Sequence, residues 1–163
     1  ARSWNSSPRM QRPIVAFETD AAGNWVARLD CGHPQHVRHS PPFMLREWVT
    51  TARGRAAMVG QQLDCVRCDR FEIPAAFVVY KRTPEFDEAT VPAGLRRDHS
   101  TKTGVWARIV VVDGRLRYCV AALNTDVELS PDRAGIVVPE VLHYVAPIGA
   151  VRFYVEFYRA PPT

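Results

Sequence analysis

Residues 31–39 read CGHPQHVRH and residues 65–68 read CVRC, and these two short stretches decide the fold of the first half of the chain. Structural zinc sites take four thiolate or imidazole ligands in a tetrahedron, and one C-x-H pair with one C-x-x-C pair supplies such a set. The predicted zinc ligands are Cys31, His33, Cys65 and Cys68. His36 and His39 are further candidates, and one of them could replace His33.

A closed structural site fits this cluster better than a catalytic one. A catalytic zinc keeps one position open for water, which would require one of the four candidates to stand apart. A domain of about 60 residues has a thin core, so metal binding would contribute directly to its folding. The alternative is a redox-active C-x-x-C pair, which usually opens a helix in a βαβ context, and no such pattern is visible here.

The surrounding sequence predicts a small α+β domain over residues 11–73, after a flexible tail at residues 1–10. Apolar runs at residues 14–17 and 25–29 flank a turn rich in Gly and Asn, which is typical of a β-hairpin.

The spacing of apolar residues predicts a helix over residues 43–58, capped by Ser40 and weakened in its later part by Gly54. Four arginines near the cluster could contact phosphate, although a solvated face is the simpler interpretation. These are Arg38, Arg46, Arg53 and Arg55.

This half resembles a small bacterial domain family of unknown function. The resemblance rests on GNWVA at residues 23–27, CGH at 31–33, QHVRH at 35–39, WV at 48–49, GR at 54–55 and C-x-x-C at 65–68. It covers roughly residues 11–73 and supports a domain there without implying an activity.

Beyond Ile73-Pro74 the helical periodicity nearly disappears. Runs rich in Val, Tyr, Phe and Ile alternate with turn residues, at residues 76–80, 105–112, 116–121, 136–138 and 151–158. Asp113-Gly114, between two of these runs, predicts a tight hairpin. Several short strands at this spacing predict an all-β sandwich or barrel for residues 74–163.

The surroundings of His99 and His143 resemble the two sequence blocks of cupins, whose small barrel holds imidazoles around an interior metal or ligand. Two usual ligands are missing. Thr101 stands where a standard cupin has a second histidine, and Trp106 lies near the usual position of an acidic ligand.

Glu156 is a candidate third ligand of this barrel site, and Glu140 is a candidate fourth. Two histidines and a carboxylate would suit iron, manganese or zinc. The alternative is a metal-free ligand pocket. In that case His99 bonds a loop, His143 is a satisfied half-buried residue, and Glu156 pairs with an arginine.

Residues 80–159 resemble more specifically the small cupin-type domain of TehB-type tellurite-resistance methyltransferases and YeaR-like proteins. The motifs are RTPxF at residues 82–86, LxxxHxTKxGxW at 95–106, GxLxY at 114–118, PExxH at 139–143 and VEFYR at 155–159. The resemblance implies a cupin-like jelly-roll barrel and an association with tellurite or other oxyanion stress, or with nitrosative stress. It does not imply methyl transfer, because the chain has no glycine-rich cofactor loop.

Together these patterns predict a small-molecule or metal-binding protein of a stress response, with a structural zinc module appended. One alternative is a metal-dependent cupin enzyme of dioxygenase or isomerase type. Another is a nucleic-acid or protein adaptor, but a net charge of +4 is too small to indicate nucleic-acid binding by itself. No apolar run suits a membrane span or a signal segment, so we expect a cytoplasmic protein. Cupin-like barrels suggest a homodimer by analogy.

Overall fold

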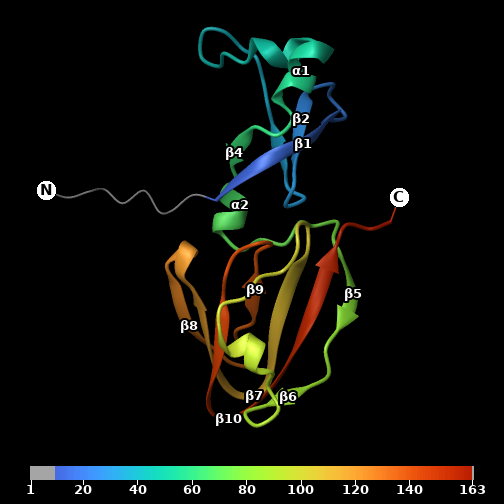
Figure 1. Cartoon of the computed structure of the whole chain (residues 1–163). Coiled ribbons are helices and arrows are strands. Elements are labelled where there is room, and N and C mark those ends of the chain that lie inside the picture. Colours follow the sequence, from blue (N-terminus) through green and yellow to red (C-terminus); the bar gives the residue numbers. More distant parts are fainter. Residues whose placement is uncertain (1–9, 163) are drawn as a thin grey trace, which may run out of the picture. The chain divides into compact units, whose positions relative to one another are not determined.

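The computed structural model describes residues 10–162 (Figure 1). These residues divide into two compact units, one from Met10 to Val66 and one that begins at Arg67. The predicted tail at residues 1–10 lies outside the described residues except for Met10. No helix in the described part of the chain is long and apolar enough to cross a membrane.

The first unit is built on a four-stranded antiparallel sheet with the strand order β3-β2-β1-β4. Its strands are β1 (Gln11–Thr19), β2 (Trp25–Leu29), β3 (Pro34–His36) and β4 (Gln62–Asp64). The predicted hairpin is confirmed, since β1 pairs with β2 and Thr19 lies opposite Trp25. The Asp20 carboxylate shapes the turn by accepting hydrogen bonds from the backbone of Ala22 and Asn24, each at 2.9 Å.

The helix predicted over residues 43–58 begins later than expected. A 3-10 turn, η1 (Glu47–Thr50), leads to the helix α1 (Ala52–Met58), and residues 43–46 are not helical. The predicted cap was wrong, because Ser40 instead forms a β-bridge with Met44. Phe43 is 93% exposed, so the apolar spacing at the start of this segment does not form a buried helical face.

Thr51 caps α1 by accepting a hydrogen bond from the backbone N–H of Gly54 at 3.0 Å. A Cβ atom on Gly54 would lie 2.2 Å from the carbonyl oxygen of Trp48. Besides its expected effect on the helix, Gly54 thus leaves room for the backbone of Trp48. The absent side chain lets α1 pack closely against η1.

The second unit is a curled antiparallel sheet of six strands, which confirms the all-β prediction for this half (Figure 1). The order along its main path is β5-β10-β7-β8, while β6 pairs with β10 and β9 pairs with β7. The strands are β5 (Val78–Arg82), β6 (Phe86–Asp87), β7 (Trp106–Val120), β8 (Thr125–Leu129), β9 (Gly135–Val137) and β10 (Tyr144–Arg159). The short helical segments are α2 (Val66–Asp69), η2 (Ala93–Arg96) and η3 (Ala121–Leu123).

The hairpin predicted at Asp113-Gly114 was wrong, because β7 runs through this point as one strand of 15 residues. β10 pairs with β7 on both sides of it, through Ile148 opposite Arg115 and Phe153 opposite Val111. The register shifts between these pairs mark β-bulges. Gly114 has a φ of +83°, so the turn chemistry of Asp-Gly serves a bulge here and not a reversal.

The bulged region changes which positions of β7 are buried. From Ala107 to Val111 the buried side chains have odd numbers, and from Leu116 to Val120 they have even numbers. Since side chains alternate along a strand, this shift keeps apolar groups on the inner face of the curled sheet. Phe153 of β10 is fully buried in this core, and Trp106 at the start of β7 is fully buried as well.

Replacing Gly114 by alanine should lower the free energy of unfolding by about 2–4 kcal/mol. The new Cβ would occupy a positive-φ backbone and lie 2.2 Å from the carbonyl oxygen of Ala150. Gly149→Ala is the matched control, because Gly149 has a φ of +68° but nothing within 4 Å of the new Cβ. It should lower the free energy by only about 1 kcal/mol in the same urea titration. Equal losses in the two variants would contradict the steric argument.

Candidate functional site

The C-x-H and C-x-x-C pairs meet in one buried group. Its members are Cys31, His33, Cys65 and Cys68, and their ligand atoms all lie within 4.8 Å of one another. Each of these residues is at most 4% exposed. Among the described residues this is the only group of three or more Cys, His, Asp or Glu side chains that could hold a metal ion.

The distances within the group match the edges of a metal tetrahedron. Cys31 Sγ lies 3.8 Å from Cys65 Sγ, which is too far for a disulfide bond. His33 Nδ1 lies 3.4 Å from Cys31 Sγ and 3.3 Å from Cys65 Sγ. In a zinc tetrahedron with bonds of ordinary length, two sulfur ligands lie about 3.8 Å apart, and a sulfur and a nitrogen ligand lie about 3.6 Å apart.

Local backbone structure brings the first two ligands together. Between β2 and β3 the Leu29 N–H donates to the His33 carbonyl at 3.1 Å, and the Gly32 N–H donates to the Leu29 carbonyl at 2.9 Å. Gly32 has a φ of +94°, which places Cys31 and His33 on the same side of the turn. Arg28 donates to the Gly32 carbonyl at 3.1 Å and holds the turn from outside.

The second pair is fixed by its own hydrogen bonds. The backbone N–H of Cys65 donates to the Met10 carbonyl at 2.7 Å, and β4 pairs with β1 immediately before it. Cys68 lies in α2, and its carbonyl accepts from the Phe71 N–H at 3.0 Å.

The other two histidines of the motif lie outside this group. His36 Nε2 lies 2.9 Å from the Asp20 carboxylate, and His39 Nδ1 accepts from the backbone N–H of Arg46 at 3.0 Å. Arg55 stacks 3.7 Å from the centre of the Trp25 ring, so it has a packing role. His33 is the imidazole that the structure brings to the cysteines.

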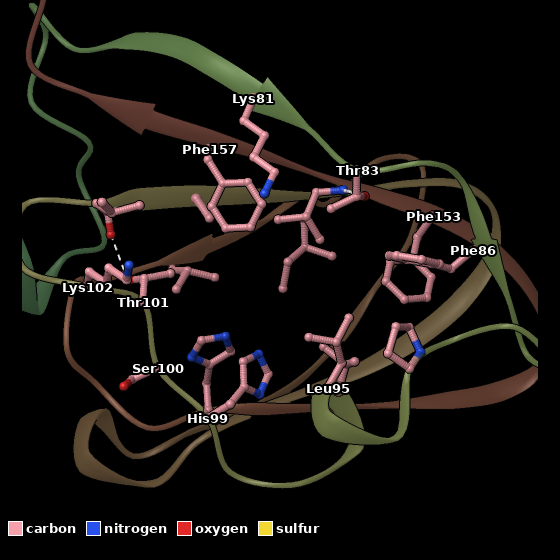
Figure 2. Close-up of a pocket in the computed structure, with 18 of the residues that line it drawn as sticks. Lys81, Thr83, Phe86, Leu95, His99, Ser100, Thr101, Lys102, Phe153 and Phe157 are labelled. Carbon is pink, nitrogen blue, oxygen red and sulfur yellow. Dashed lines mark hydrogen bonds between the residues drawn. The ribbon is translucent and has the colours of Figure 1, made fainter.

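A pocket of about 490 Å³ opens within the second unit, inside the curled sheet (Figure 2). Its walls are mostly apolar and come from β7, β10 and the segments around η2. The apolar side chains of the lining include Leu95, Ala107, Ile109, Phe153, Val155 and Phe157. Side chains alternate between the two faces of a sheet, and paired residues of β7 and β10 point to the same face. The inward side chains of both strands therefore face this space.

His99 and His143 lie side by side at one wall of the pocket. Their backbones exchange two hydrogen bonds, at 3.0 Å and 2.9 Å, and their ring centres are 4.1 Å apart. His99 Nδ1 lies 3.0 Å from the Arg97 carbonyl, and His143 Nδ1 lies 3.1 Å from the Val141 carbonyl. A carbonyl only accepts, so each Nδ1 carries the proton and each Nε2 has a lone pair in the neutral ring.

His143 is 4% exposed, and its burial lowers its pKa from 6.5 to about 4. The carbonyl of Val141 opposes this shift in part, while nearby His99 adds to it. His143 is therefore a neutral imidazole near pH 7, which suits a hydrogen-bond acceptor or a weak base.

Glu156 does not join these histidines. It pairs with Arg82 at 2.6 Å and lies on the face of β10 opposite the pocket-lining Val155 and Phe157. Glu140 accepts a hydrogen bond from the hydroxyl of Thr103. Neither carboxylate lines the pocket, so the structure brings together two of the four side chains considered for a barrel metal.

Two pocket residues were missed by the sequence analysis. Lys81 and Lys102 both line the pocket, and they are the only lysines in the chain. Their shared signal in the sequence is rarity, since the chain has nineteen arginines and two lysines, and Lys102 also stands in the motif at residues 95–106.

Comparisons with known proteins support both predicted resemblances. Residues 15–72 match the family described as a protein of unknown function, DUF3565, and residues 81–155 match the TehB-like domain. No curated protein sequence matches the chain.

Two solved structures are each similar to just over half of the chain. One is TehB from Haemophilus influenzae, with 21% identity and a TM-score of 0.49 over 53% of this chain and 32% of TehB. The chain thus spans about a third of that relative. The other is a protein from E. coli strain K12, with 24% identity and a TM-score of 0.52 over 56% of this chain and 98% of that protein. The E. coli protein therefore shares its fold with just over half of this chain. The chain is thus similar to DUF3565 over residues 15–72 and to the TehB-like domain over residues 81–155.

Proposed function

We propose that the chain is a cupin-type protein that binds a small molecule in the pocket of its second unit, while zinc stabilises the Cys/His cluster. The observation that carries the proposal is a pocket of about 490 Å³ with apolar walls and a few convergent polar groups. Small-molecule sites in proteins typically have this volume and this lining.

The pocket supports ligand binding more than metal-dependent catalysis. Two imidazole Nε2 atoms are available to a metal, but no carboxylate among the lining residues adds a third protein ligand. An iron, manganese or zinc enzyme normally takes three or more ligands from the protein. Binding of a small molecule without a metal is therefore the simpler function for these residues.

The Cys/His cluster supports a structural zinc. Three thiolates and one imidazole complete a tetrahedral set, which leaves no position for a reactive water. The cluster is buried, and its ligands come from two segments far apart in the sequence, so a bound ion would cross-link them.

The physiological part of the proposal is a stress response to tellurite or a related oxyanion, or to nitrosative stress. Its support is the TehB-like match, whose family name refers to tellurite resistance. Tellurite and selenite therefore belong among the ligands to be tested.

The purified full-length chain should contain about one zinc ion per molecule when measured by mass spectrometry of the elements. Cys68→Ser should lose this zinc, because it removes one of four ligands. Cys119→Ser is the matched control, since Cys119 lies half-buried in β7 outside the cluster. A zinc-free wild type, or a Cys68→Ser variant that retains stoichiometric zinc, would refute the structural zinc.

Stability should fall as the pH falls from 7 to 5. His143 binds a proton in the unfolded chain near pH 6.5 but resists it in the folded chain down to about pH 4. The unfolded state therefore takes up more protons in this window. Between pH 7 and pH 5 the free energy of unfolding of the wild type should fall by roughly 2 kcal/mol more than that of His143→Gln. Urea unfolding of both proteins at each pH measures the difference, and acid effects at the Cys/His cluster cancel in it. Parallel pH profiles would contradict the assignment.

A ligand that enters the pocket should raise the melting temperature of the full-length protein. The screen uses tellurite, selenite, small thiols, and aliphatic and aromatic organic molecules of both charges. Leu95→Trp is the test variant, because Leu95 lines the pocket and is half-buried, so a larger ring can fill the space. Any stabilising compound should lose its effect in this variant. Stabilisation that persists in Leu95→Trp, or a screen without any hit, would count against a pocket ligand.

A further inference from the structure

Both lysines of the chain line the same pocket, although only 19 of 163 residues do so. Both lysine residues are exposed, so they belong to the mouth of the pocket. Lys81 Nζ lies 5.9 Å from the centre of the Phe157 ring, which is itself a pocket wall. In Figure 2 Lys81 and His99 lie on opposite sides of the pocket.

The pocket contains no acidic side chain to neutralise these ammonium groups. No ion pair joins either lysine to a carboxylate anywhere in residues 10–162. Arginines of the outer sheet surface differ, because Arg82, Arg117 and Arg152 are paired with carboxylates at 2.6 to 3.0 Å. The lysines therefore give the pocket mouth a net positive charge that attracts an anion.

The inner wall of the pocket offers a neutral hydrogen-bond acceptor instead of a cation. His143 is buried, and its Nδ1 proton is committed to the Val141 carbonyl, so its Nε2 accepts a hydrogen bond. The two threonine hydroxyls of the pocket already have partners within the protein. Thr83 bonds the Pro84 carbonyl and the Val155 N–H, at 2.9 Å and 3.0 Å, and Thr101 donates to the Val105 carbonyl at 2.7 Å.

Between these two ends the walls are apolar, with Phe153, Val155 and Ile109 among them. From this arrangement we propose that the ligand is an amphipathic organic carboxylate. Its apolar body fills the pocket, its anionic head lies between Lys81 and Lys102, and a hydroxyl or N–H at its far end reaches the imidazoles. This inference rests on the proposed binding function and names the class of ligand.

The two lysines also provide the probe. Reductive methylation with ¹³C-formaldehyde keeps their charge and should give two side-chain NMR signals, beside that of the terminal amine. Titration with decanoate should shift both lysine signals, whereas decanamide and decylamine, which share the apolar body, should bind at least about tenfold more weakly. Adding a terminal hydroxyl, as in 10-hydroxydecanoate, should strengthen binding in the wild type and not in His143→Phe.

Variants separate the charge effect from general binding. Lys81→Gln combined with Lys102→Gln should weaken decanoate binding about tenfold, measured by calorimetry. Arg115→Gln removes one positive charge from a side chain outside the pocket lining and should leave the affinity unchanged.

Decanamide that binds as tightly as decanoate would overturn the ligand class and leave the binding function standing. If tellurite alone binds as tightly as decanoate, the inference that the ligand has an apolar body is wrong, and the binding function again stands. If none of these compounds and no member of the wider screen binds, the proposed function itself fails.

Discussion

The antiparallel pairing of β7 with β10 is the constraint on which the second unit depends. All other strands of the sheet pair with one of these two, since β5 and β6 pair with β10 while β8 and β9 pair with β7. Bulges near Gly114 curl the pair without breaking it. The same alternation that buries Phe153 and Ile109 turns them toward one concave space, so the pocket is a direct consequence of this pairing.

The sequence carried most of the information about the Cys/His cluster, because its chemistry is local. Two short pairs of soft ligands predict a metal site whatever the fold between them. The choice among His33, His36 and His39 needed the backbone, since Gly32 at positive φ turns His33 toward Cys31 and leaves His36 to Asp20.

Other predictions failed where one local signal has two structural uses. Asp113-Gly114 supplies the positive φ that a tight turn needs, but a bulge within a long strand needs it as well. Only the distant pairing with β10 decides between them. The lysines of the pocket escaped notice for a related reason. Lys81 and Lys102 lie on separate segments of the chain, and only the fold brings them to one pocket mouth.

The set of alternate side chains that β10 turns inward decides what the pocket is able to bind. Phe153, Val155 and Phe157 face inward, so Glu156 must face outward, where Arg82 neutralises it. A register one residue different would have placed that carboxylate beside the two imidazoles as a third possible metal ligand, and would have halved the positive charge that the two lysines give the pocket. With Glu156 outside, the pocket keeps two cations, two acceptor nitrogens and apolar walls. Such a set attracts negative charge at the mouth and offers a metal too few ligands inside.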